Sequence, residues 1–427
     1  MRIGQIAIDV APLRQSRDFR RLFTGRFVSM AGNAVATTAA DWQIYSLTHD
    51  SLAVGLLTLA SSAGMLIGLL TGGMLADRHD RRTLLMVVRL PQAVLAALLM
   101  VNSLLPHPAL WPLYVITFAI GLLAGLSSPA SAAATPALVG DDKMPAAAAL
   151  NATASQVGNL GGPAIAGLLI AGPGLASCYA IDAVCFAVFG LAMIGLRSMP
   201  PGTRAQRPGF KSLSEGFRYV RQNRVVGGML LVDTNAMLFG MPSALFPALA
   251  STHFHGGSAT FGLLAAAPGL GALVGAATSG WTGHLKRPGL VVIWAGIIWG
   301  ASIAAFGLVR SLPLALFFLA LAGMGDLISE VLRNALLQIY TPDQLRGRVS
   351  SLYLAQVTTA PALGNVEAGG VAGLISPAFS VVSGGLACVA GAVLLGTLIP
   401  SLRNATLTSQ HVLSTKDPTP PALSSLT

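Results

Sequence analysis

The feature that most constrains the fold is an apolar run of about 20 residues that recurs along the whole chain. Each run is long enough to cross a hydrocarbon core of roughly 30 Å. In lipid every backbone amide must be paired within its own segment, so each run must be a helix. Charged residues make up only 10% of the 427-residue sequence, which excludes a soluble globular protein.

Twelve apolar spans can be counted, and they predict an all-α polytopic membrane protein. They cover residues 22–47, 52–76, 83–105, 110–134, 145–171, 175–197, 225–250, 259–284, 289–309, 312–336, 348–374 and 377–400. Cytoplasmic loops retain positive charge, so Lys and Arg indicate the orientation. Most of the 26 basic residues precede the first span or fall in alternate loops, whereas the outer loops hold only Arg310. Both termini are therefore expected to be cytoplasmic.

The longest connection divides the spans into two sets of six. Pro, Gly and Arg are frequent over 199–210, and 211–222 predicts a short amphipathic helix at the inner surface, either a tether or a regulatory element. We expect a cytoplasmic N-terminal segment over 1–21, six-helix bundles over 22–198 and 225–400, a cytoplasmic linker over 199–224, and a disordered cytoplasmic tail over 401–427.

The two halves carry matching residues at one constant separation. The pairs are Thr135-Pro136 with Thr341-Pro342, Asn159 with Asn365, Gly167 with Gly373, and Arg81 with Arg287. A duplicated six-helix unit explains these pairs. Paired bundles of this kind place a substrate cavity near the membrane midplane between them.

Several classes of function find no support in the sequence. No phosphate-binding loop of an ATPase is present, no nucleophile and base stand together, and the scattered basic residues do not form a nucleic-acid patch. The three cysteines lie in apolar spans and suggest neither disulfides nor a metal site. His253 and His255 lie at an expected outer turn, where we expect solvated surface side chains rather than metal ligands. We expect no cleavable signal peptide, no cofactor, no metal, no nucleic-acid partner and no enzymatic activity.

The loop between the second and third spans, Gly73–Arg82, reads GMLADRHDRR. It resembles the corresponding loop of the major facilitator superfamily, G-x-L-A-D-R-x-G-R-K, although Asp80 replaces the usual glycine. The resemblance implies the major facilitator fold of two six-helix bundles. An acid here can accept hydrogen bonds from a facing helix N-terminus, and the arginines can pair with carboxylates or lipid phosphates. The candidate residues for a cytoplasmic gate are Gly73, Asp77, Arg78, Arg81 and Arg82; alternatively, the charges only fix topology.

The fifth span carries a second motif, formed by Gly158, Gly162, Pro163 and Gly167. It resembles the antiporter-type motif of superfamily exporters, G-x-x-x-G-P-x-x-G-G, with Ala166 at one terminal glycine. Glycines permit close packing, and proline removes an amide donor and bends the helix. The segment therefore predicts a seam between moving bundles, with ordinary small-residue packing as the alternative.

Ionisable residues inside membrane spans are functional candidates by default. The candidates for substrate or proton coupling are Arg26, Asp41, Asp233, Asp326, Glu330 and Arg333, with Asp182 and Glu367 weaker. Asp326, Glu330 and Arg333 share one helical face. They could exchange protons, or they could form a static ion pair that holds helices together. Arg89 is expected to extend to the inner surface. The fourth span lacks the arginine that many proton-coupled exporters carry.

Segments spread over residues 18–400 resemble the enterobactin exporter family, including FRRLFTGRF, AATPALVG, KSLSEGFRYV and TPDQLRGRVSSLYLAQ. The segment TPDQLRGRVSSLYLAQ also occurs in related drug and macrolide effluxers. The resemblance implies proton antiport that carries a catecholate siderophore from cytoplasm to periplasm across a bacterial inner membrane, by a monomer in contact with lipid. Candidates for stacking against the substrate are Trp42, Tyr45, Phe239, Phe246 and Tyr353. The alternatives are a multidrug or macrolide effluxer and a transport-inactive receptor or sensor.

Overall fold

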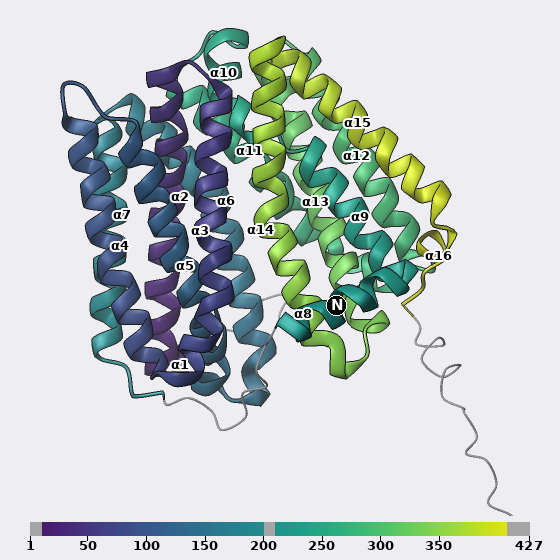
Figure 1. Ribbon diagram of the computed structural model, residues 1–427, viewed down its shortest axis with the longest axis horizontal. Helices are drawn as coiled ribbons and strands as arrows, with labels where there is room; N and C mark the ends of the chain where they lie inside the picture. Colours follow the sequence, from purple (N-terminus) through teal and green to yellow (C-terminus); the bar gives the residue numbers. More distant parts are fainter. Residues whose placement is uncertain (1–10, 200–209, 408–427) are drawn as a thin grey trace, which may run out of the picture.

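The computed structural model describes residues 11–199 and 210–407, and these residues form helices joined by short turns. The first half contains α1 (Ala11–Gln15), α2 (Arg17–Thr48), α3 (Ser51–Arg78), α4 (Arg81–Leu104), α5 (Trp111–Val139), α6 (Met144–Ala171) and α7 (Leu175–Ile194). The second contains α8 (Phe210–Gln222), α9 (Arg224–Phe239), α10 (Phe246–Ala248), α11 (Ser258–Thr278), α12 (Pro288–Leu308), α13 (Leu312–Tyr340), α14 (Asp343–Leu374), α15 (Pro377–Leu398) and α16 (Pro400–Arg403). Figure 1 shows the two halves side by side.

The helices account for all twelve predicted spans. Within the described ranges, nine helical segments are long and apolar enough to cross a membrane by length and composition. The other three spans are α2, α6 and α14, which are more polar but have 32, 28 and 32 residues. At 1.5 Å per residue each exceeds the roughly 30 Å that a span requires. The fold is therefore the twelve-helix, two-bundle architecture of the major facilitator superfamily.

The seventh span, predicted over 225–250, is present as the candidate membrane segment Arg224–His253, but its helix is interrupted rather than continuous. Helix α9 ends at Phe239, and the chain resumes only as short turns from Ser243 to His253 that include a π-helical segment. The break falls at Gly240–Pro242, because glycine tolerates the bend and proline supplies no amide donor. Its place in the fold is beside the cavity described below.

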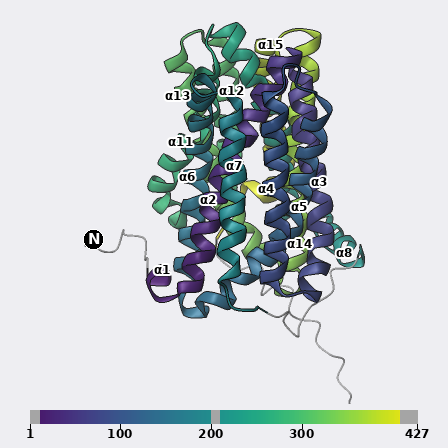
Figure 2. The same cartoon turned by 90° about the vertical axis from the view of Figure 1, so that its left-hand side faces the viewer.

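Close helix packing inside the first half depends on glycine. Gly64, Gly68 and Gly72 of α3 lie directly against the backbone of α5, where an added Cβ would collide with main-chain atoms. Gly121 and Gly125 of α5 face α3 in the same way. Small residues allow this approach in membranes, where van der Waals packing replaces the hydrophobic effect between helices. Figure 2 shows this half from its outer side.

Among the described residues, the two halves pack against each other from one end of the molecule as far along as Leu160 of α6, whose Cα would lie 3.0 Å from an added Cβ on Gly269 of α11. We call the end that holds the α3–α4 turn the basic end and the other the opposite end. An added Cβ on Gly55 of α3 would meet the carbonyl carbon of Asn365 on α14 at 2.8 Å. An added Cβ on Gly167 of α6 would meet Gly262 Cα of α11 at 2.8 Å, and Ser258 Oγ donates to the Gly167 carbonyl at 3.3 Å. The opposite end is thus closed.

The basic end leaves the halves apart. Gly73 and Gly158 in the first half, and Gly347 in the second, face open space. No hydrogen bond or ion pair between described residues joins the halves at this end. Helix α8 lies there beside α14, as Figure 1 shows, where Glu215 pairs with Arg348. Of the linker expected over 199–224 and the tail expected over 401–427, residues 200–209 and 408–427 lie outside the described residues, as do residues 1–10. The start of the tail is ordered, because α16 reaches Arg403 and both Leu402 and Ala405 are buried.

Candidate transport site

A cavity of about 600 Å³ lies between the halves. The first half contributes Asn33, Thr37, Gln156, Asn159 and Pro163, among others. The second contributes Ser243, Phe246, Trp299, Asp326 and Glu330, among others. The lining combines apolar surface with a few polar groups, as ligand pockets do, and its volume lies in the usual range for small-molecule sites.

A second pocket of about 290 Å³ lies inside the first half and shares Met30 and Asn33 with the first cavity. Arg26 of α2 and Arg89 of α4 both line it. The expectation that Arg89 reaches the inner surface was wrong. Its guanidinium donates to Gln92 Oε1 at 2.8 Å and lies 4.9 Å from the centre of the Phe189 ring, and these contacts hold it inside the bundle.

A buried ion network occupies the second half. Arg333 Nη2 of α13 lies 2.9 Å from Asp233 Oδ1 of α9 and 3.7 Å from Asp326 Oδ1. Gln356 of α14 donates to Asp233 Oδ2 at 3.0 Å, and Arg333 Nη1 donates to Ser329 at 2.9 Å. Asp233 and Arg333 are 1% and 6% exposed, so this pair is shielded from water.

The predicted face of α13 therefore divides into two parts. Arg333 faces Asp233 and Asp326, whereas Glu330 has no ion-pair partner among the described residues. Both Asp326 and Glu330 line the cavity between the halves. Arg333 is thus neutralised by carboxylates inside the second half, whereas Asp326 and Glu330 face the cavity where a substrate would pass.

The antiporter-type motif of α6 lies between two helices. Gly162 faces Ala34 of α2, Gly167 faces α11 across the contact between the halves, and Pro163 lines the cavity. Gly158 faces open space. Three of the four motif residues therefore lie where α6 meets its neighbours or the cavity.

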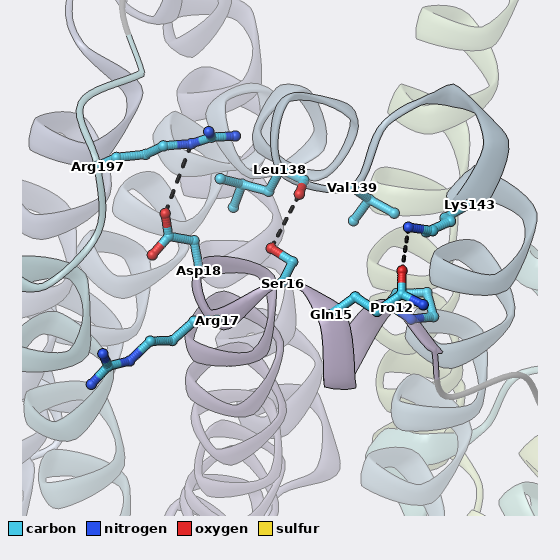
Figure 3. A pocket seen from close by; sticks show the side chains of 9 residues that line it. All are labelled: Pro12, Gln15, Ser16, Arg17, Asp18, Leu138, Val139, Lys143 and Arg197. Carbon is cyan, nitrogen blue, oxygen red and sulfur yellow. Dashed lines mark hydrogen bonds and ion pairs between the residues drawn. The ribbon is translucent and has the colours of Figure 1, made fainter.

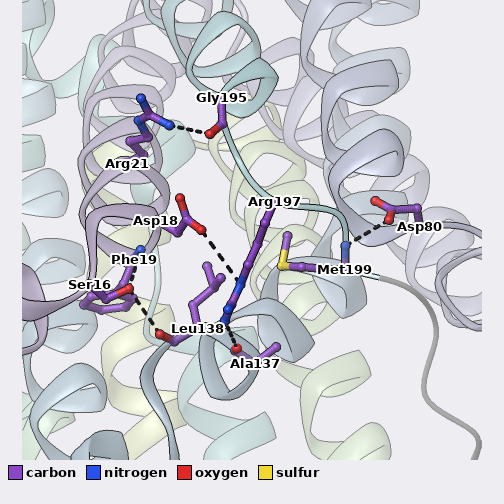
Figure 4. A network of polar contacts seen from close by, with 10 residues as sticks. All are labelled: Ser16, Asp18, Phe19, Arg21, Asp80, Ala137, Leu138, Gly195, Arg197 and Met199. Carbon is purple, nitrogen blue, oxygen red and sulfur yellow. Dashed lines mark hydrogen bonds and ion pairs between the residues drawn. The ribbon is translucent and has the colours of Figure 1, made fainter.

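Some of the charged candidate gate residues have hydrogen-bond partners and others have none among the described residues. Arg82 donates to the carbonyls of Met193 and Ile194, and Arg81 to the carbonyl of Ala133, so both arginines bind main-chain carbonyls of other helices in their own half. Asp77 and Arg78 have no side-chain partner within the part of the chain that the structure describes. Figure 4 shows the surrounding contacts at this end, among them Arg197 with Asp18.

Asp80, which departs from the superfamily pattern, has the most contacts in this turn. One carboxylate oxygen accepts from the amides of Arg82 and Thr83 and caps α4. The other accepts from the Met199 amide at 2.9 Å and from the Ser198 hydroxyl. Burial acts to raise the Asp80 pKa, but the bonds from Ser198, Thr83, Met199 and Arg82 outweigh it and lower that pKa.

A third pocket, of about 410 Å³, lies at the surface of the basic end (Figure 3). It is lined by Ser16, Arg17, Asp18, Lys143 and Arg197, among others. Its cations are largely occupied: Arg197 pairs with Asp18, and Lys143 donates to Gln15. It lies far along α2 from the cavity between the halves.

The remaining predicted residues lie away from both inner cavities. Asp41, Asp182 and Glu367 line neither, and no ion pair holds any of them within the described ranges. Among the proposed aromatic residues only Phe246 lines the central cavity, while Trp42 stacks on Phe261 of α11 at 5.5 Å. Trp42 thus helps to join the halves.

The sequence reasoning missed the polar residues that complete the cavities. Asn33, Thr37, Gln156 and Asn159 line the central one, and Ser127 lines the pocket of Arg26 and Arg89. Helical spacing contains part of the signal, since residues 26, 29, 30 and 33 share one face of α2. Which helix that face meets depends on tertiary packing.

The twelve-helix fold and the cavity between its halves define a multi-pass membrane transporter of the major facilitator type. Comparison with known proteins agrees. The family model described as transmembrane secretion effector matches residues 7–420. The enterobactin exporter EntS of Citrobacter koseri is 33% identical over 396 residues, which cover 93% of this chain and 95% of that protein. EntS of Escherichia coli K12 is 32% identical over 405 residues, covering 95% and 97%.

The chain therefore belongs to the transmembrane secretion effector family and, within the major facilitator superfamily, to the enterobactin exporter family. Solved structures support the fold. A POT family transporter in complex with a thioalcohol-conjugated peptide gives a TM-score of 0.72 at 14% identity, covering 90% of this chain and 96% of that one. The nucleoside transporter NupG gives a TM-score of 0.67 at 12% identity, covering 91% of this chain and 100% of that one.

Proposed function

We propose that this chain is a secondary active exporter that moves an enterobactin-like catecholate siderophore from the cytoplasm to the periplasm by alternating access. The observation that carries the proposal is the likeness to enterobactin exporters over more than nine-tenths of the chain. The 600 Å³ cavity between the halves supports it, because the substrate path of a two-bundle transporter lies there.

The basic end is the cytoplasmic end in this proposal. Positive charge concentrates there, and both termini would lie on that side of the bacterial inner membrane. The cavity is closed at the opposite end, so this conformation accepts substrate from the cytoplasm. We propose that the chain works as a monomer, and exposed apolar side chains such as Val87, Leu168 and Leu308 suit contact with lipid. We assign transport and no enzymatic reaction to the chain.

The gate residues fit the other conformation. Asp77 and Arg78 are free here, where the halves are apart at the basic end. When that end closes, Asp77 would meet the second half and accept hydrogen bonds from a helix N-terminus, whose dipole favours negative charge. Arg81, Arg82 and Asp80 already hold the turn to the first half, so the turn moves with its bundle.

Proton antiport would use the carboxylates that face the cavity. Among the described residues Glu330 has no ion-pair partner, and Asp326 shares Arg333 with the better-placed Asp233. A proton that enters from the periplasmic side could neutralise either carboxylate and be released to the cytoplasm when the cavity changes sides. The ion pair of Asp233 and Arg333 would keep α9 and α13 together through this cycle.

Expression in a bacterium that makes a catecholate siderophore but lacks its exporter tests the proposed function. The expected result is restored siderophore in the medium and a lower intracellular pool, with no change in sensitivity to macrolides or dyes. Drug resistance without siderophore release would instead identify a multidrug effluxer. If neither phenotype changed with the protein present in the membrane, the transport-inactive receptor reading would replace the proposal.

A further inference from the structure

We propose that Arg26 and Arg89 form an anion subsite inside the first half, which binds one ionised, oxygen-bearing aromatic arm of the exported substrate. This inference rests on the proposed export function for the identity of the ligand. The presence of an anion site rests on the structure of the pocket alone.

Three of the helices that line the pocket supply its hydrogen-bond donors. Arg26, Ser29 and Asn33 follow one face of α2. Helix α4 supplies Arg89 and Gln92. Helix α5 adds three serines, at positions 127, 128 and 131. The pocket is therefore rich in groups that donate hydrogen bonds to an anion.

The charge in this pocket is not balanced. No carboxylate lines it, and Arg26 has no hydrogen-bond or ion-pair partner among the described residues. Arg89 binds only the neutral side chains of Gln92 and Ser127, while Asp182 attracts it from beyond ion-pair range. Two unpaired cations in a low-dielectric site repel each other, so an anion between them would stabilise the site.

Arg333, the buried arginine of the second half, differs from Arg26 and Arg89 in having carboxylate partners. That guanidinium has two carboxylate partners, Asp233 and Asp326, and is therefore already neutralised. The Nε atoms of Arg89 and Arg333 are both buried with no hydrogen-bond partner among the described residues, but of the two side chains only Arg89 lines one of the two inner cavities. Most buried polar atoms are satisfied, so this unused donor inside a pocket is consistent with a partner that arrives with the ligand.

Arg89 is also held in a fixed orientation. Its guanidinium carbon lies 4.9 Å from the Phe189 ring centre and 5.8 Å from that of Phe186. Gln92, which accepts from Arg89, donates in turn to the Ile120 carbonyl at 3.2 Å. A guanidinium fixed in this way loses little side-chain freedom when it binds an anion.

The lining and volume indicate the chemical class of the ligand. A guanidinium fork donates two parallel bonds to neighbouring oxygens, as in a carboxylate or an ortho-dihydroxyaryl group. Phe186, Met30 and Met65 add apolar surface suited to a ring. At about 290 Å³ the pocket is at the lower limit for a whole drug-sized ligand, so it fits one arm, and Met30 and Asn33 connect it to the larger cavity.

Equilibrium binding of radiolabelled 2,3-dihydroxybenzoate to the full-length protein tests the subsite. The protein would be held in phosphatidylcholine nanodiscs, with uncharged catechol as the comparison ligand. Arg26→Gln is the cleanest variant, since it leaves no partner unpaired in the part of the chain that the structure describes. Arg89→Gln and the charge-preserving Arg89→Lys complete the set, and the exposed Arg310→Gln is the matched control. Thermal unfolding of every variant checks folding.

We expect Arg26→Gln and Arg89→Gln each to weaken 2,3-dihydroxybenzoate binding about tenfold or more, the scale of a charge-assisted hydrogen bond. Arg89→Lys should lose less affinity for 2,3-dihydroxybenzoate than Arg89→Gln, and Arg310→Gln should lose none. Catechol should bind the wild type and all variants with the same affinity. Equal affinity of the wild type and both glutamine variants would overturn the subsite. Competition by added phosphatidylglycerol would assign the pocket to a lipid headgroup and overturn the assignment to a substrate arm.

Transport separates this inference from the proposed function. If Arg26→Gln exported catecholate at the wild-type rate, export would stand and the subsite would fall. If the wild type bound the anion through both arginines but exported no catecholate, the subsite would stand and the proposed substrate would fall.

Discussion

Arg333 and Asp233 lie 2.9 Å apart and join α13 to α9 in the interior of the second half. Removal of one partner from a buried pair leaves an uncompensated charge and costs about 3–5 kcal/mol. We expect Arg333→Gln to lower the unfolding temperature more than Asp233→Asn, because Arg333 retains Asp326 as a partner. The double variant should be more stable than Arg333→Gln alone. Thermal unfolding in detergent measures all three, and strictly additive losses would contradict a direct coupling.

Glu330 should affect coupling without affecting the fold. It lines the cavity and has no ion-pair partner in the described chain, so Glu330→Gln removes a charge and breaks no contact. We expect substrate exchange to persist while stimulation by a pH gradient falls at least severalfold. Glu367→Gln, on α14 and away from the cavity, is the matched control. Full stimulation in Glu330→Gln would remove this residue from the proton path.

The glycines of α6 should respond differently according to what they face. A side chain at Gly167 would press on Gly262 and the Ser258 carbonyl, and overpacking costs about 1–3 kcal/mol. Gly167→Val should therefore open the opposite end and increase labelling of cysteines placed in the cavity from the periplasmic side. Gly158 faces open space, so Gly158→Ala should leave the cysteine labelling unchanged. Equal labelling in both variants would argue against a closed contact at Gly167.

Asp77 should affect turnover more than stability. Its side chain has no partner among the described residues, so Asp77→Asn should leave the unfolding temperature unchanged. Export should slow severalfold, because the contact at the closed basic end would lose its charge. Gly283→Ala, in the corresponding connection of the second half, should be tolerated. An undiminished export rate in Asp77→Asn would leave the charges of this loop with a topological role alone.

Asp80 should contribute stability that depends on pH. Its folded pKa is lowered, so its contribution is present above the ordinary value of about 3.9 and is lost as pH falls through the folded value. At pH 7 Asp80→Asn should cost on the order of 1 kcal/mol, since Asn cannot accept two bonds through its amide nitrogen. The difference from the wild type should shrink below about pH 4. A pH-independent difference would contradict a role for the charge.

The membrane architecture could be predicted from the sequence because hydropathy and helix length act locally. Twelve apolar runs specify twelve helices, and the loop at Gly73–Arg82 marks the superfamily. The break in the seventh span was also encoded locally, by Gly240 and Pro242, but the apolar residues on both sides concealed it.

The contacts of single side chains could not be predicted in the same way. Asp80 meets Ser198, 118 positions further along the chain, and only the fold brings them together. Arg89 is long enough to reach either the surface or the interior, and rings on α7 decide between them. The burial of Asp233 against Arg333 likewise depends on how α9 packs on α13.

Transport by the purified protein in proteoliposomes tests the central claim most directly. With the cytoplasmic face outward and an acidic lumen, an enterobactin-type catecholate and a macrolide would be supplied outside, with and without the pH gradient. We predict that the catecholate accumulates inside, that the gradient increases its accumulation, and that the macrolide does not enter. Accumulation of the macrolide without the catecholate would contradict the account.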